Sequence, residues 1–467
     1  MTRRLPLAAA SGLAALGLLA GAGTAGLWLP EQTIGTAAPV STTANPTSAT
    51  LACPPGVLDS FEPTNPAAPA GIWSSTGLGV GDEAPETLTA TANSGKALDL
   101  PTGVVVAGQG GGELLGLSTT SCAVPSTDQW LVIGPTTLGD DALLVLTNPS
   151  DAPSVAQITG YGAAGLLDDA PQRVTVPAHS SVNVLPAGWY ADEERLALRI
   201  RADGGGVAAF AQLSRMSGET PLGASWISAS SPAASQTILG VGGEASATLR
   251  LVVPGDAPAT ARIRLLTASG AQDLEGGAAT IDAGTVLDIP LDGASAEPIA
   301  VSIDSDEPVV ASIEEEWSGG AWPGSDAHWG ILSALVPSTS LTSAQIPGAD
   351  SLGKIVSSQL GAAPLRATSV ATNSGGSDPT TKLLLALPED STDGSVDVEV
   401  GGQSKTVAAG SSVLLDLPNA DSRITASGAV RAAILLTART PNGTVRATWP
   451  IGTTGLAARE SLVTVGP

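Results

Sequence analysis

Residues 143–149 have the sequence LLVLTNP, a short apolar run that ends in a proline. The same plan recurs at residues 249–254, LRLVVP, and at residues 383–388, LLLALP. A short apolar run that a turn-forming residue closes is typical of a buried β-strand. Because one plan occurs three times in the chain, it predicts a repeated module.

Three further features follow this strand in each copy. They are an alternating run (residues 156–158, 261–265 and 396–400), a turn of small residues leading to another strand (177–184, 282–289 and 408–415), and a closing tryptophan (Trp226, Trp329 and Trp449). Alternation with a period of two predicts half-buried strands. The tryptophans fall at matching places in the three copies, so we expect them to fill the module cores.

The predicted fold class is all-β, with tandem immunoglobulin-like β-sandwich modules of six or seven short strands each. Abundant turn formers, 56 Gly and 35 Pro, support this prediction. A partial copy precedes the three repeats, because residues 110–117 lead to Trp130 as residues 204–207 lead to Trp226. The expected domains are a signal peptide or signal anchor (1–30), a Thr/Ser/Pro/Ala-rich stalk (31–50), a partial β module with a disulfide (51–135), and three sandwich repeats (136–235, 236–336, and 337–467 with a preceding linker).

The N-terminus has the features of an export segment. Arg3 and Arg4 precede an uncharged stretch that runs to residue 30. This stretch fits either a cleaved signal peptide or an uncleaved anchor in the cytoplasmic membrane. In both cases we expect the rest of the chain to be extracytoplasmic, either membrane-anchored or secreted.

Cys53 and Cys122 are the two cysteines of the chain, and both follow the export segment. An even pair in an oxidising compartment predicts one disulfide. A pair of metal-binding or redox thiols is the alternative, but the chain has neither a C-x-x-C spacing nor suitable ligands nearby.

The run from Ser121 to Trp130, the strand that ends at Pro149, and residues 220–226 (TPLGASW) resemble an uncharacterised family of secreted actinobacterial proteins, a domain of unknown function. The resemblance covers most of the chain after the stalk. It implies an actinobacterial cell-envelope setting and supplies no catalytic or binding residues.

Charge and composition argue against several kinds of function. A formal net charge of −24 repels nucleic acid. His179 and His328 are the only histidines and lie in separate loops, so we predict no catalytic residue, metal site or cofactor. Residues 314–316 (EEE) could place Glu315 on an inward face beside tryptophans, as in a glycosidase. An exposed acidic turn is the favoured interpretation.

Three tryptophans, Trp189, Trp317 and Trp322, are not shared between the copies and fall in predicted loops. They are candidates for an exposed platform on which a sugar ring could stack. The leading hypothesis is a non-enzymatic cell-envelope protein that acts as a spacer or protein-interaction scaffold. The alternative is a module that binds cell-wall glycan through these tryptophans.

Overall fold

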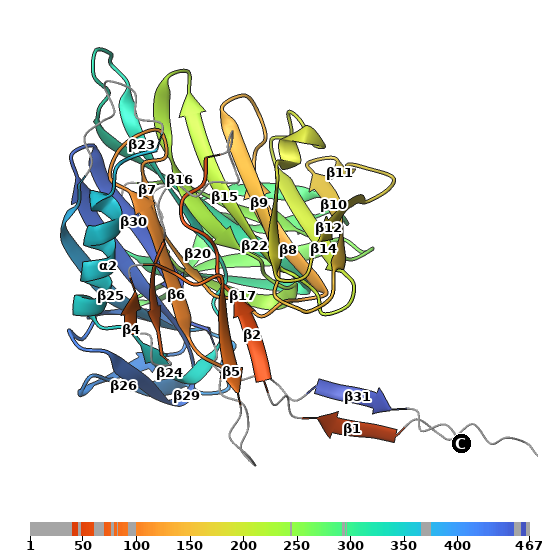
Figure 1. Ribbon diagram of the computed structural model, residues 1–467. Coiled ribbons are helices and arrows are strands. Elements are labelled where there is room, and N and C mark those ends of the chain that lie inside the picture. Colours follow the sequence, from red (N-terminus) through yellow and green to blue (C-terminus); the bar gives the residue numbers. More distant parts are fainter. Residues whose placement is uncertain are drawn as a thin grey trace, which may run out of the picture. The chain divides into compact units, whose positions relative to one another are not determined.

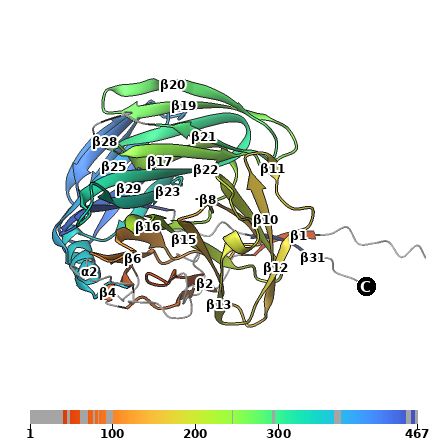
Figure 2. The same cartoon turned by 90° about the horizontal axis from the view of Figure 1, so that it is seen from above.

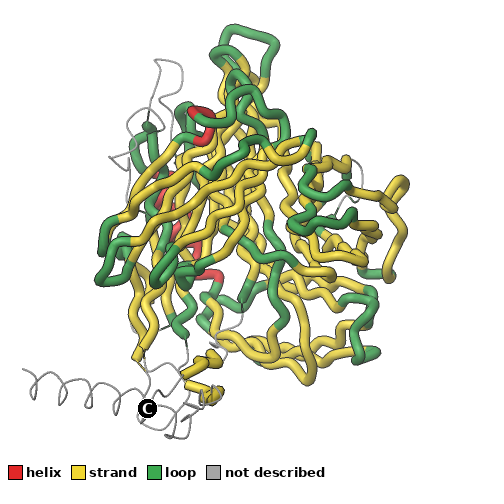
Figure 3. The backbone as a smooth tube through the Cα atoms, turned by 90° about the vertical axis from the view of Figure 1, so that its right-hand side faces the viewer, coloured by secondary structure: helices red, strands yellow, loops and turns green. Residues whose placement is uncertain are grey.

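The computed structural model describes most of the chain, and strands make up nearly all of its regular secondary structure (Figures 1 and 3). The described residues are 40–44, 48–59, 70–75, 79–81, 83–91, 100–242, 245–291, 295, 297–365, 375–452 and 459–463. The all-β prediction is confirmed. The predicted export segment, residues 1–30, lies outside these ranges. Within them, no helix has the length and apolar character needed to cross a membrane.

The chain divides into two compact units. One unit contains Met1–Asn45 and Ala457–Pro467, and in it β1 (Val40–Ala44) pairs antiparallel with β31 (Arg459–Val463). Segments from opposite ends of the sequence therefore form one two-stranded sheet. Residues 40–44 and 48–50 belong to strands, although the sequence predicts a flexible stalk there. Their partners are far away in the sequence, so local composition could not indicate the pairing.

The other unit, Pro46–Leu456, contains four modules. The front module contains β2 (Ser48–Ala52), β3 (Gly71–Ser74), β4 (Gly79–Gly81), β5 (Thr87–Thr91), β6 (Gly103–Gln109) and β7 (Gly116–Ser121). Module 1 contains β8 (Asp128–Gly134), β9 (Asp140–Asn148), β10 (Ser154–Gly162), β11 (Gly165–Leu166), β12 (Gln172–Val176), β13 (Ser180–Val184), the 3-10 helix η1 (Pro186–Gly188), β14 (Leu196–Ala202), β15 (Ala208–Ser217) and β16 (Thr220–Ser228).

Modules 2 and 3 complete this unit. Module 2 contains β17 (Ala233–Val241), β18 (Ser246–Val252), β19 (Ala259–Thr267), β20 (Gly270–Ile281), β21 (Val286–Pro290), β22 (Ile299–Ala321) and β23 (His328–Leu335). Module 3 contains β24 (Leu341–Ile346), the helix α2 (Ala349–Gly361), β25 (Ser377–Leu387), β26 (Ser395–Val400), β27 (Gln403–Ala408), β28 (Ser411–Asp416), β29 (Ser422–Thr440) and β30 (Gly443–Pro450). The strand β8, within the expected front domain 51–135, pairs with β14 of module 1.

Modules 1 to 3 share one pattern of strand pairing. Module 1 has a central sheet in the order β13-β9-β15-β16 and a peripheral sheet in which β10 and β8 flank β14, with β11 and β12 beside β10. In modules 2 and 3 one long strand, β22 or β29, pairs first in the peripheral sheet and then in the central sheet. Each module is therefore a two-sheet sandwich. Its strand order differs from the separate ABED and CFG sheets of an immunoglobulin domain.

The last strands of the four modules, β7, β16, β23 and β30, pack together at the centre of this unit (Figure 1). Seen from above, the front module (orange), module 1 (yellow), module 2 (green) and module 3 (blue) surround them (Figure 2). The hydrogen bonds that join successive modules here run from Ala224 N to Leu115 O (3.0 Å), Ala334 N to Ser225 Oγ (3.1 Å), Gly320 N to Asn442 O (2.9 Å) and Trp449 Nε1 to Ser121 Oγ (2.7 Å). The four modules thus form a closed ring.

Glycines allow the central strands to come this close. A Cβ atom on Gly116 would lie 2.1 Å from the carbonyl oxygen of Ala224, and one on Gly330 would lie 2.6 Å from the Cα atom of Leu222. Because the obstructing atoms belong to the backbone, no side-chain movement would relieve the clash. Glycine is therefore required at both positions.

Both faces of each central sheet are buried. In β9, Leu144 and Leu146 face the core of module 1, whereas Leu143 and Val145 face the front module. We call the second of these faces the back face of a central sheet. A strand that is buried on both sides is expected to be continuously apolar rather than alternating. This burial explains the run LLVL at residues 143–146.

The same arrangement continues around the ring. The back face of module 2 packs on the peripheral sheet of module 1, and the back face of module 3 packs on the peripheral sheet of module 2. The first contact contains Val252 and Val310 against Trp130 and Val132, and the second contains Leu384 and Ala433 against Leu239 and Ala300. Each module therefore contributes one sheet face to the next interface, and the ring is held by continuous apolar packing.

The front module is a partial copy. It keeps the central order β4-β3-β6-β7, but β2 and β5 form the described part of its peripheral sheet. Residues 75–78 alone join β3 to β4, which is too short for counterparts of β10 and β12. Module 1 helps to complete the core, because Phe210 and Trp226 pack with Leu51 and Leu88 of the front module. On the other side, α2 packs against β3 and β6.

The predicted disulfide between Cys53 and Cys122 is confirmed. Cys53 follows β2 and Cys122 follows β7, and both side chains are buried. The bond therefore joins the first and last strands of the front module.

The three repeated tryptophans are buried, with exposed fractions of 4% for Trp226, 2% for Trp329 and 1% for Trp449. Trp226, however, packs in the core cluster of the front module and not in that of module 1. The prediction that the tryptophans occupy equivalent positions in the three modules is wrong. Trp449 pairs with Ile434, whose counterparts in modules 1 and 2 pair with Ile227 and Leu335. The closing strands carry their tryptophans at different register positions, so distance along the sequence did not indicate equivalence.

Candidate functional site

A hollow of about 340 Å³ lies at one end of the central strands, and we call it the tryptophan pocket. Strands from modules 1 and 2 form its wall. Its lining residues are Leu222, Ser246, Glu316, Trp317, Ser318, His328, Trp329 and Gly330. The pocket exists because β22 and β23 extend past the point where β18 begins, so the last residues of β22 and the first residues of β23 stand at the edge of the sheet.

Trp317 and Trp329 line this pocket, and a third indole ring, that of Trp322, packs against Trp329. Trp322 lies edge-on to Trp329, with ring centroids 4.6 Å apart and an angle of 70° between the planes. The guanidinium carbon of Arg446 lies 3.9 Å from the ring centroid of Trp317. A cation above one face of an indole is attracted by the electron-rich ring and occupies that face. Trp317 can therefore offer a ligand its edge or its other face.

The acidic group of the pocket is already paired. Glu316 forms an ion pair with Arg215 of module 1, which also pairs with Glu314 at 2.7 Å and with Asp140. Burial by itself would lower the pKa of Arg215, but the carboxylates of Glu314 and Asp140 raise it above the ordinary value. The four side chains hold modules 1 and 2 together beside the pocket, and Glu316 is oriented by this network.

Glu315 does not lie in an exposed acidic turn, so that expectation is wrong. It sits within β22 between Ala247 and Ser333 and is 2% exposed. Burial raises the pKa of Glu315 to about 8, against the opposing effects of a hydrogen bond from Gly242 N at 3.1 Å and the charge of Arg446. The strand continues through residues 314–316 because β18 and β23 pair with it on both sides, which charge composition alone could not show.

The structure brings together two of the three predicted platform tryptophans. Trp317 lines the tryptophan pocket together with Trp329, Trp322 packs against Trp329, and both are partly buried. Trp317 belongs to β22 rather than to a loop. Trp189 follows η1 in module 1, where it is half-buried against that module's core and lies edge-on to Tyr190 at 6.3 Å. Trp329 was not expected in the pocket, because the recurrence of one closing tryptophan in each copy indicated a core residue.

The histidines do not form a catalytic pair with a nucleophile. Nδ1 of His328 lies 3.2 Å from the carbonyl oxygen of Gly319, and Nε2 of His179 lies 2.8 Å from Asp151 on the surface of module 1. A nucleophile needs a base within hydrogen-bond reach and a third group that orients it. In the described part of the chain, no group of three or more His, Cys, Asp or Glu side chains could hold a metal ion.

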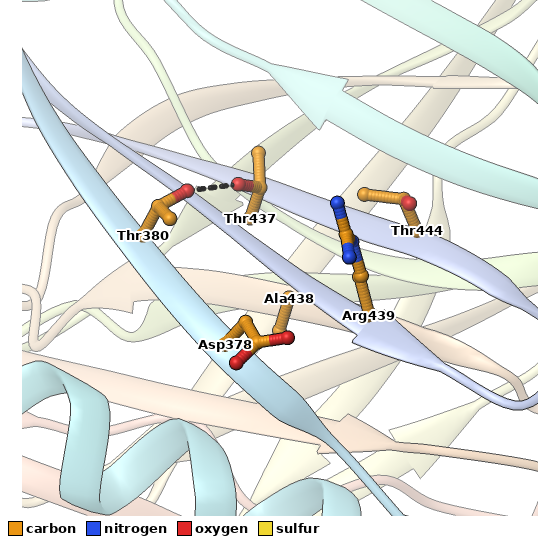
Figure 4. A pocket seen from close by; sticks show the side chains of 6 residues that line it. All are labelled: Asp378, Thr380, Thr437, Ala438, Arg439 and Thr444. Carbon is orange, nitrogen blue, oxygen red and sulfur yellow. Dashed lines mark hydrogen bonds between the residues drawn. The ribbon is translucent and has the colours of Figure 1, made fainter.

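A second hollow, of about 350 Å³, lies on β25, β29 and β30 of module 3 (Figure 4). Its lining is polar and consists of Asp378, Thr380, Thr437, Ala438, Arg439 and Thr444. The hydroxyls of Thr380 and Thr437 hydrogen-bond to each other at 2.5 Å. These hydroxyls are mutually engaged, so the hollow offers a polar surface without an activated group.

These features define an all-β protein of four ring-packed modules that has open surface hollows and no assembled catalytic centre among the described residues. The chain belongs to a family of unknown function (DUF5719), whose profile matches residues 79–392. The match begins at β4 of the front module and ends after β25 of module 3, so it spans modules 1 and 2 entirely. No curated protein matches the chain.

Proposed function

We propose that this protein is a non-enzymatic, exported protein of the cell envelope whose ring of modules acts as a protein-interaction scaffold. The observation that carries the proposal is the closure of the ring. Because every module packs its back face on a neighbour, the loops at the rim keep fixed positions relative to one another. Loops on a rigid framework are the usual place for binding residues.

The ring favours a scaffold over a spacer. A spacer separates what is attached to its two ends, and modules arranged in a row would serve that purpose. Here the modules return to a common centre, and the terminal strands β1 and β31 pair with each other. The four modules therefore surround a shared centre instead of extending in a row.

Co-purification tests this proposal. The full chain with a C-terminal tag would be cross-linked in its native envelope and isolated from detergent extracts. We expect the same envelope protein to be recovered in a fixed ratio to the chain in independent preparations. Turnover of a cell-wall substrate by the purified protein, or the absence of any stoichiometric partner, would contradict the scaffold function.

Glycan binding is a second candidate, and the clustering of Trp317, Trp322 and Trp329 favours it. Sugar rings stack on indole faces, and Glu316 and His328 could accept or donate hydrogen bonds to hydroxyls at the same pocket. The test is sedimentation of the protein with purified cell wall. Trp322→Ala should weaken binding about tenfold, whereas Trp189→Ala, outside the pocket, should leave it unchanged. Equal binding by both variants and the wild type would exclude this pocket as a glycan site.

A further inference from the structure

A turn of module 1 holds a leucine out in solvent. Leu138 lies between β8 and β9 and is fully exposed. The residues on both sides of it are fixed: Thr136 Oγ1 donates to Tyr190 O at 2.5 Å, and Met216 N donates to Gly139 O at 2.7 Å. An apolar side chain on a fixed backbone has little conformational entropy left to lose on binding, so it is suited to act as an anchor for a partner.

The conformation of this turn depends on Gly139. Its φ is +95°, and a Cβ atom there would lie 2.3 Å from the carbonyl oxygen of Met216. A hydrogen bond of 2.9 Å from Asp140 N to Thr137 O closes the turn. Leu138 is therefore held at one place on the surface instead of folding back onto the module.

Leu138 forms one side of a hollow of about 390 Å³, which we call the Leu138 hollow. Its apolar lining comes from Leu114 of the front module and from Leu138, Ala187 and Met216 of module 1. A space of this size accepts a large apolar side chain together with part of its backbone. The hollow crosses the boundary between two modules, so the packing of the front module on module 1 creates it.

The charged side chains in the lining of this hollow are all acidic. They are Glu113, Asp140, Asp141 and Asp192. The guanidinium of Arg215 is close by, but it is shared among Asp140, Glu314 and Glu316. The hollow therefore combines an apolar floor with a negative rim, and electrostatic complementarity favours a positively charged occupant.

We propose that the Leu138 hollow is a docking site for a protein segment that presents a large apolar side chain between lysine or arginine residues. The apolar side chain enters the hollow against Leu138 and Met216, and the cations lie against the acidic rim. This inference rests on the proposed scaffold function and specifies the chemistry of the partner.

Peptide binding tests the docking site directly. The probes are fluorescein-labelled peptides of sequence GKKLKKG, GKKSKKG and GEELEEG, measured by fluorescence anisotropy with the full chain at 150 mM salt. We expect GKKLKKG to bind at least tenfold more tightly than GKKSKKG, and GEELEEG not to bind. Equal binding of the two basic peptides would show only non-specific attraction to a protein of net charge −24 and would overturn the proposal.

Variants with matched controls locate the site. Leu138→Asp should weaken GKKLKKG binding at least tenfold, whereas Leu166→Asp, an equal charge change at a leucine that is 56% exposed outside the hollow, should not. The pair Asp141→Asn and Asp192→Asn should weaken binding about fivefold, whereas Asp256→Asn with Asp282→Asn should not. Equal effects of the hollow and control variants would overturn the proposal. The six positions are exposed or half-buried, so unchanged melting temperatures would confirm that each variant is folded.

The experiments distinguish failure of the docking site from failure of the scaffold function. If the full chain co-purifies with a stoichiometric partner, and Leu138→Asp affects neither that partner nor the peptide, the docking site fails and the scaffold stands. If the peptide binds at the hollow but no partner co-purifies, the docking site stands and the scaffold fails. A wild-type dimer that Leu138→Asp dissociates would show that the hollow holds a second copy of this chain, which overturns the proposed partner chemistry.

Discussion

The front module and module 2 have equivalent central sheets but complete their cores differently. Module 2 has both sheets, and its core cluster consists of its own residues. The front module lacks two strands, and its core cluster includes Leu143, Val145, Phe210 and Trp226 from module 1. The comparison shows that a module in a closed ring can lose part of a sheet when a neighbour's back face and a covalent bond replace the missing packing.

One position on the back face illustrates this difference. Phe210, Ser312 and Ala433 are equivalent, because they pair with Val145, Arg250 and Leu384, each four residues before the proline that ends the repeat's first strand. Ser312 and Ala433 face modules with complete peripheral sheets, and small side chains fit there. Phe210 faces the partial module, where the missing strands leave room for a large ring.

The largest loss of stability is expected when the phenylalanine ring at position 210 is removed. Phe210→Ala should lower the free energy of unfolding by about 3–5 kcal/mol, because a buried aromatic ring is lost and a cavity remains. Hydrogen exchange should increase in β2 and β5 of the front module, although Phe210 belongs to module 1. As a control, Ile313→Ala in the core of module 2 should increase exchange in module 2 instead. Increased exchange confined to module 1 in the Phe210→Ala variant would contradict the shared core.

Removal of the disulfide should have a comparable or slightly smaller effect. Cys53→Ala with Cys122→Ala should cost about 4 kcal/mol in the chain-entropy model for a separation of 69 residues. The loss should be concentrated in the front module, which the bond braces. Denaturant unfolding under oxidising and reducing conditions measures it, and a variant as stable as the oxidised wild type would contradict the bracing role.

The third prediction concerns the carboxyl group buried in module 2. The pKa of Glu315 rises from 4.5 to about 8 on folding, so the folded state binds the proton more tightly than the unfolded state. Stability should therefore fall by a few kcal/mol as pH increases from about 4.5 to 8, at ~1.4 kcal/mol per pKa unit. Glu315→Gln should remove this contribution and be more stable than the wild type at pH 8. Urea unfolding at pH 5 and pH 8 measures the difference, and parallel behaviour of the two proteins would contradict it.

The smallest effect is expected at the contact between module 3 and the front module. Ser121→Ala removes the acceptor of the Trp449 indole N–H and should cost about 1–3 kcal/mol, because the buried donor is left unpaired. Ser412→Ala is the control, since Ser412 Oγ donates to Leu266 O at 2.6 Å between modules 3 and 2. Hydrogen exchange should increase in β7 for the first variant and in β28 for the second. The same pattern in both would show that the ring opens as one unit.

Local patterns predicted much of the fold. The repeated first strands at residues 143–149, 249–254 and 383–388 form β9, β18 and β25, and the alternating runs form β10, β19 and β26. The disulfide followed from the number of cysteines. The prediction that the three closing tryptophans are equivalent was wrong. The register of each closing strand depends on its pairing with β15, β22 or β29, and not on distance along the chain.

The candidate site was less predictable. Trp317 and Trp322 were singled out, but Trp189 lies apart from them, and Trp329 was assigned to the core alone. Glu315 was expected in an exposed turn, because three adjacent carboxylates are usually solvated. Its burial depends on β18 and β23, which pair with the strand on both sides. The Leu138 hollow had no sequence signal, because its walls come from two modules.

The amino-acid sequence by itself determined the all-β class, the threefold repetition and the disulfide, because periodicity, turn residues and cysteine number act over short stretches or simple counts. Only the tertiary structure decided that the modules close into a ring, that their sheets are buried on both faces, and that a partial module is completed by its neighbour. Those outcomes depend on contacts between side chains hundreds of residues apart, such as Trp449 with Ser121. Local sequence patterns do not predict such contacts.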